Sequence, residues 1–356
     1  MRRFAGVVIA AGSTVVFMSS AQAAQAPRAT GASAIAGHPY RHGLVPMLSA
    51  RDANPAATVR VCSSSCLRYR GGIAGVGVTT GKELVYLVFW GSQWGTEGTN
   101  SNGYATFTGD PNGVAPDVQA FLSGLGTGGE LWSGVMTQYC QGAALGATAC
   151  STTRPHVAYP TGGAFAGVWE DSSAASPAAS TAHQLAVEAE SAATHFGHTT
   201  TASNRDAQYV IVSPTGTDPD NYQTQGFCAW HDYSGDASMD GGGAASGPLL
   251  AFTNLPYIPD AGANCGAGFV NPGNKLDGVT IVEGHEYAET ITDQFPAGGW
   301  TANNGEENGD LCAWKRSGIG RAQNVTLTTG TFAVQGTWSN ISGKTGACAI
   351  SHTIVT

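Results

Sequence analysis

Charged residues are scarce in this chain of 356 residues: they make up 12% of it, and the formal net charge is −9. The negative balance argues against nucleic acids and anionic membrane surfaces as partners. Because charge is so scarce, a local cluster of acidic side chains points to function more strongly here than it would in a charge-rich protein.

Long apolar runs are missing too, apart from one near the N-terminus. Arg2 and Arg3 precede an apolar stretch at 6–18, and Ala21-Gln22-Ala23 forms a small-x-small cleavage site. Residues 1–23 therefore predict a signal peptide, because the run is too short for a membrane span. We expect a secreted, extracellular protein without a membrane span.

Paired C-x-x-C spacing is absent, which argues against a zinc site made of four cysteines. The chain has 8 cysteines, and an even number in an exported protein predicts disulfides. Pairing each cysteine with its sequence neighbour predicts the bonds Cys62–Cys66, Cys140–Cys150, Cys228–Cys265 and Cys312–Cys348.

Internal repeats are missing, and no linker is visible after residue 58. Residues 24–58 lack periodicity and predict a flexible leader or pro-segment, with His38 and His42 in an exposed loop. Residues 59–356 predict one disulfide-stapled α+β domain with a mixed β-sheet and packed helices. The expected strands are 83–90, 209–214, 226–233 (at a sheet edge), 249–257, 324–327, 331–334 and 350–355. The expected helices are 117–125, 130–139, 181–196 and 276–295.

The helix predicted at 276–295, with Asp277 as its N-cap, carries the motif H-E-x-x-E. His285 and Glu289 are four residues apart and share one helical face, and Glu286 projects about 100° away from His285. This is the layout of the zinc-peptidase motif H-E-x-x-H with a carboxylate in place of the second histidine, which zinc accepts. The pattern predicts a zincin-like helix whose ligands are His285 and Glu289 and whose general base is Glu286.

The same glutamates have a simpler interpretation as the solvated face of a surface helix, together with Glu283. If a metal binds, its third ligand comes from another segment, because Asp293 is about 12 Å from His285 along the helix axis. The leading candidates are Glu307 and Asp310, in a loop rich in oxygen ligands. His231 is the next, with a structural role as its alternative, and His231 and Tyr287 are candidates for contact with a substrate or transition state.

Several of these segments, in this order, resemble the EXORDIUM (phosphate-induced protein) family and its bacterial secreted relatives. They are 86–92, 209–212, 226–228, the H-E-x-x-E stretch 285–289 and the E-x-x-D-x-C stretch 307–312. The two motifs recur together in that family, which implies that Glu307 and Asp310 are partners of the helix. Many plant members lack the H-E pair and are regarded as apoplastic growth-related proteins. The full set here implies a member that still holds metal.

The function that we expect is that of a secreted, monomeric zinc peptidase acting on an extracellular peptide or protein. The alternative is a non-catalytic extracellular protein that binds cell-wall glycans or another protein, with a structural metal site that holds calcium, or with no metal, at the same carboxylates. Glycoside hydrolysis by Glu286 and Glu307 ranks third. In the glycan-binding alternative, four exposed aromatic residues would be platforms: Trp94, Trp230, Trp300 and Trp314.

Overall fold

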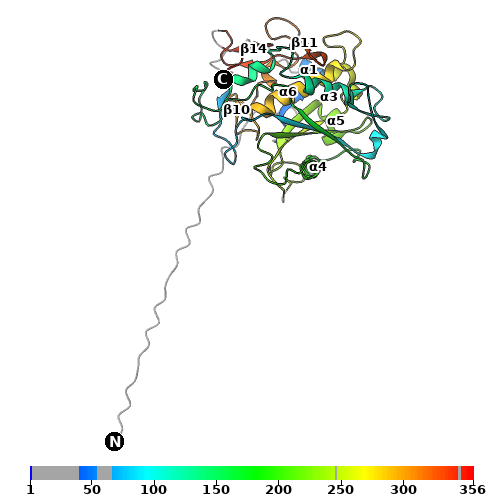
Figure 1. The fold of residues 1–356 in the computed structure, drawn as a ribbon, viewed down its shortest axis with the longest axis horizontal. Helices are drawn as coiled ribbons and strands as arrows, with labels where there is room; N and C mark the ends of the chain where they lie inside the picture. Colours follow the sequence, from blue (N-terminus) through cyan, green and yellow to red (C-terminus); the bar gives the residue numbers. More distant parts are fainter. Residues whose placement is uncertain (2–39, 54–65, 245–246, 344–345) are drawn as a thin grey trace.

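The computed structural model describes residues 1, 40–53, 66–244, 247–343 and 346–356 (Figure 1). Residues 2–23 of the predicted signal peptide, His38 and Cys62 lie outside these ranges, and with Cys62 the predicted Cys62–Cys66 bond. In the described part of the chain, no helix is long and apolar enough to cross a membrane.

A mixed six-stranded sheet, in the order β1-β8-β9-β7-β3-β6, organises an α+β fold. Strands β6, β3, β7 and β9 run parallel, whereas β8 is antiparallel to both of its neighbours. Strand β7 is buried along its whole length, as its apolar sequence predicts for a strand covered on both faces. The bounds are β1 His42–Pro46, β3 Leu84–Trp90, β6 Phe165–Asp171, β7 Ala207–Val212, β8 Phe227–Tyr233 and β9 Ala251–Leu255.

Strand β8 is an interior strand, so its prediction as an edge strand is wrong. Strand β1 pairs with it, and His42 lies opposite His231. The prediction of a flexible leader is therefore wrong for residues 40–53, which form β1 and helix α1 (Leu48–Ala53). This segment lacks periodicity because its strand is specified by a partner far away in the sequence.

The helices lie on both faces of the sheet, with α4 (Ala182–His195) below it and α6 (Asp277–Thr292) above it in Figure 1. Thr181 and Gln184 form a capping box at the start of α4. The helix predicted at 117–125 is α3 (Val114–Gly124), whereas 130–139 holds only the 3₁₀ helix η2 (Ser133–Gln138). Short 3₁₀ or α turns also occur at η1 (Ser92–Trp94), η3 (Pro219–Asn221), α5 (Tyr222–Gln225), η4 (Ile258–Cys265) and η5 (Asp310–Cys312).

The predicted N-cap, Asp277, is instead the first residue of helix α6. Its N-cap is Leu276, and the Asp277 carboxylate instead accepts hydrogen bonds from the backbone N–H groups of Val270 and Asn271. Asp277 therefore fixes the loop that leads into the helix. The helix ends at Thr292, three residues before the predicted end and ahead of Pro296, which cannot continue a helix.

Four small hairpins and bridges surround this core, and β12 packs on α6. Residues 350–355 are not a strand, contrary to the prediction. The pairs are β2 (Arg68–Tyr69) with β10 (Trp300–Thr301), β4 (Glu97–Thr99) with β5 (Ala105–Phe107), β11 (Gln323–Leu327) with β12 (Gly330–Val334), and β13 (Thr337–Ser339) with β14 (Ala347–Ala349).

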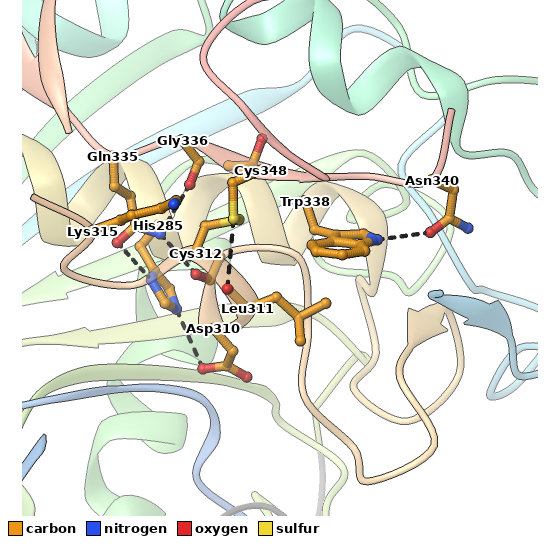
Figure 2. Close-up of a disulfide and its surroundings, with 12 residues drawn as sticks. His285, Asp310, Leu311, Cys312, Lys315, Gln335, Gly336, Trp338, Asn340 and Cys348 are labelled. Atoms are coloured by element: carbon orange, nitrogen blue, oxygen red, sulfur yellow. Dashed lines mark hydrogen bonds and ion pairs between the residues drawn. A yellow bond between two sulfur atoms is a disulfide. The ribbon is translucent and has the colours of Figure 1, made fainter. Parts of the chain in front are cut away.

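Three of the predicted disulfides are confirmed: Cys140–Cys150, Cys228–Cys265 and Cys312–Cys348. They indicate an oxidising environment of the extracellular type. The bond between Cys312 and Cys348 fastens the segment after Asp310 to the C-terminal hairpin, close to His285 (Figure 2).

Candidate metal centre

Helix α6 is buried on every side, and Glu283, Glu286 and Glu289 have no exposed surface. The solvated-face interpretation is therefore wrong. Burying an ionised carboxylate is costly unless a proton, a hydrogen-bond donor or a cation offsets its charge. The atoms that surround these carboxylates therefore indicate whether the helix binds a metal ion.

Glu289 is held by one of its two carboxylate oxygens. Oε1 accepts hydrogen bonds from the backbone N–H groups of Gly309 (2.9 Å) and Asp310 (2.8 Å). Oε2 is buried, has no hydrogen-bond partner and lies 3.1 Å from Nε2 of His285. The backbone of the 307–312 loop thus orients Glu289 and leaves one oxygen directed at the histidine.

Gln335 orients His285 in the same manner (Figure 2). Its Nε2 donates to the carbonyl of Gly309, so its Oε1 faces Nδ1 of His285 at 3.2 Å. In the neutral ring Nδ1 is therefore the protonated nitrogen, and Nε2 then presents a lone pair. A histidine that donates through one nitrogen and is left free at the other is typical of metal sites.

His231 reaches the same place from β8. Its Nε2 lies 3.7 Å from Oε2 of Glu289 and 3.4 Å from Oε2 of Glu307, and it has no hydrogen-bond partner. Its Nδ1 lies 3.4 Å from the hydroxyl of Thr290. His231, the second choice for the third ligand, thus lies in the group, together with the two first choices, Glu307 and Asp310.

Glu307 and Asp310 complete the group from the loop after α6. Both oxygens of Glu307 are buried and without hydrogen-bond partners. Asp310 accepts from the backbone N–H of Glu307 through Oδ2, and its Oδ1 lies 3.7 Å from Nε2 of His285. The Asp310 side chain is 15% exposed, so the solvent side of the group lies here.

The contacts within this group are close to the separations of ligands around a tetrahedral ion, and the candidate ligand atoms fall into two overlapping sets, His231–Glu286–Glu289 and His285–Glu289–Asp310. Zinc bonds of 2.0–2.1 Å place neighbouring tetrahedral ligands about 3.3 to 3.4 Å apart. The four contacts above measure 3.1, 3.4, 3.7 and 3.7 Å. Lone pairs that face one another at this range, in the interior and without donors, need a cation or protons between them. Described residues in this group can therefore hold a metal ion.

Glu286 lies beside these ligands, with a carboxylate oxygen within 4.8 Å of ligand atoms of His231 and Glu289. Both of its oxygens are buried and without hydrogen-bond partners. Burial and the neighbouring carboxylates raise the pKa of Glu286 and of Glu307 well above the usual range. Without a metal, these carboxyl groups therefore tend to retain protons.

The other ionisable members of the group respond to the same surroundings. Burial, with the Asp310 charge, raises the pKa of Glu289 to about 7. Burial lowers the pKa of His231. For His285 burial acts in the same direction, but the carboxylates of Glu289 and Asp310 outweigh it and raise its pKa well above the usual value. A divalent cation would displace these protons.

Two glycines allow the backbone to approach the group. A Cβ at Gly309 would lie 2.8 Å from Cγ of His285. Gly43, in β1, has φ of +54°, and its Cβ would collide with Oε2 of Glu289 and lie 2.5 Å from Cδ2 of His231. Strand β1 therefore covers the group directly.

Other predicted residues lie elsewhere. Tyr287 is buried on another side of α6, where its ring stacks on Trp132, and the structure does not bring it to the ligands. The prediction of exposed aromatic platforms is wrong, because all four side chains pack in the core: Trp94, Trp230, Trp300 and Trp314.

Comparison of the chain with models of protein families, with curated proteins and with solved structures finds no match. The resemblance to the EXORDIUM family therefore stays a prediction from the motifs alone. The functional argument depends on the geometry of the metal centre.

Proposed function

We propose that this protein is a zinc-dependent hydrolase of peptide bonds. One observation carries the proposal: buried Oε2 of Glu289 lies 3.1 Å from Nε2 of His285 and 3.7 Å from Nε2 of His231, with Glu286 beside it, and none of these three atoms has a hydrogen-bond partner among the described residues. Two histidines and one glutamate form a donor set of catalytic zinc. Imidazole nitrogens favour zinc over calcium, which takes six to eight oxygens.

Each residue has a distinct task in this proposal. Zinc, when bound, supplies a Lewis acid that polarises a carbonyl and acidifies a water molecule. Glu286 accepts the proton of the attacking water and returns it to the leaving amine. Glu307 and Asp310 add negative charge near the ion, which weakens it as a Lewis acid, so we expect modest activity.

A second candidate function is a non-catalytic protein with a structural metal site. Its support is the closure of the centre: β1 covers the ligands, and Glu307 is placed to fill a fourth position, as in structural zinc sites. In a structural site Glu286 would be a ligand with His231 and Glu289, so that its replacement would remove the metal.

The test is Glu286→Gln in the purified secreted protein. We expect the zinc content to stay that of the wild type and hydrolysis of a peptide library to fall by roughly 10² to 10⁴-fold, the usual contribution of a general base. Glu283→Gln is the matched control, since Glu283 is equally buried on α6 but belongs to none of the candidate ligand groups. A wild type that holds zinc and cleaves no peptide would favour the structural candidate.

A further inference from the structure

A second group of ligand atoms lies next to the first. His42 of β1, Asp232 of β8 and Asp236 in the following turn each offer one ligand atom, and these atoms lie within 4.8 Å of one another. We infer that these three residues bind a second divalent cation, of the zinc or manganese class. This site shares no ligand with the proposed catalytic centre.

Asp232 gives the strongest indication of a bound ion. Its side chain is fully buried, and Oδ1 accepts a hydrogen bond from the backbone N–H of Tyr233 at 2.8 Å. Oδ2 is buried and has no hydrogen-bond partner among the residues that the structure describes. A carboxylate oxygen left without a donor in the interior is costly unless something positive faces it.

Hydrogen bonds from Ser238 stabilise Asp236 as a carboxylate anion. Its Oδ1 accepts from the backbone N–H of Ser238 and its Oδ2 from the Ser238 hydroxyl, both at 2.8 Å. Its Oδ2 also lies 3.8 Å from Nε2 of His42. Two carboxylates therefore face a single imidazole, and a divalent cation would balance their charge and bind all three groups.

The donor set and the exposure of the site specify the class of ion. One imidazole nitrogen and two carboxylate oxygens suit zinc or manganese better than a cation that takes only oxygen ligands. The side chains of His42 and Asp236 are 19% and 17% exposed. Water can therefore fill the remaining positions, in contrast to the fully buried ligands His231, His285 and Glu289.

The second site lies beside the part of β1 that covers the first centre, so an ion bound there would affect that cover. His42 immediately precedes Gly43, the residue of β1 that covers Glu289 and His231. An ion shared by β1, β8 and the next turn would hold this cover in place. The second ion is also the more accessible of the two, so a chelator should remove it first.

The experiment counts zinc ions. The full secreted protein is stripped with a chelator, reloaded with Zn²⁺, freed of excess by gel filtration and analysed for metal. We expect about two ions in the wild type and about one in Asp236→Asn, Asp232→Asn and His285→Ala, since each removes a ligand of one site. Asp240→Asn is the matched control, because Asp240 is exposed in the same segment and belongs to neither group.

The outcomes separate this inference from the proposed function. Equal zinc content in the wild type and Asp236→Asn would overturn the second site, and His42 and Asp236 would then form an ion pair only. If His285→Ala alone loses zinc, the catalytic proposal stands without the second site. If Asp236→Asn loses the one ion present and His285→Ala keeps it, the second site stands and the catalytic proposal falls. Circular dichroism confirms that each variant is folded.

Discussion

Helix α6 and strand β1 both reach the candidate metal centre, but they depend on different information. The helix carries three of the candidate carboxylates and imidazoles within five consecutive positions, 285–289, and its pattern is local. Strand β1 has 5 residues, and its backbone covers the same centre because it pairs with β8. Ligands on one element are visible in a sequence, whereas the segment that encloses them is a product of tertiary contacts.

Removing the anchor of β1 tests whether the strand is an integral part of the fold. Arg41 is buried and its Nε lies 2.5 Å from Oδ2 of Asp220. Arg41→Ala should cost about 3 to 5 kcal/mol of unfolding free energy, because a buried carboxylate loses its partner. Denaturant unfolding measures the loss. Arg321→Ala, at an exposed position, is the control and should change the free energy of unfolding by no more than about 0.5 kcal/mol.

A methyl group added at Gly43 of β1 tests how closely this strand approaches the candidate ligands. Gly43→Ala places a Cβ against Oε2 of Glu289, so we expect about 1 to 3 kcal/mol of destabilisation and a loss of zinc. Gly216→Ala is the control, since Gly216 has φ of +80° with nothing within 4 Å of its added Cβ. Equal effects of the two variants would show that backbone strain alone is responsible, and that β1 does not enclose the centre.

On the helix side, Gln335→Ala tests the orientation of His285. Loss of the amide that accepts from Nδ1 should weaken zinc binding by about 10 to 100-fold without removing a ligand. Titration with Zn²⁺ against a competing chelator measures the affinity. Gln138→Ala removes a buried amide that bonds to Val135 and should leave the affinity unchanged.

The last prediction concerns pH. The folded pKa of Glu289 is about 7 against a usual 4.5, so the metal-free native state binds more protons than the unfolded chain between these values. The stability of the metal-free protein should therefore fall as the pH rises from 4.5 to 7, by at most about 1.4 kcal/mol for each pH unit in this interval. Zinc binding releases these protons, so zinc affinity should rise over the same interval. Thermal unfolding with and without zinc checks both directions, and a metal-free melting temperature that rises with pH would contradict the ligand protonation.

Much of the centre could be predicted where the spacing is local. His285 and Glu289 share a face because four residues make about one helical turn, and three neighbouring cysteine pairs were found by their order in the chain. His231 could only be offered as a runner-up, since 54 residues separate it from His285 and no periodicity links them.

The amino-acid sequence alone was therefore enough to specify the helix, its H-E-x-x-E motif and the buried strands, because helical and strand periods follow from backbone geometry within a few residues. Three further features were decided only by the tertiary structure: β1 forms the edge of the sheet beside β8, Gln335 orients His285, and His42 lies close to Asp232 and Asp236. Each of these contacts joins segments that are far apart in the sequence. They are stabilised by burial and strand pairing across the whole fold, which no local pattern encodes.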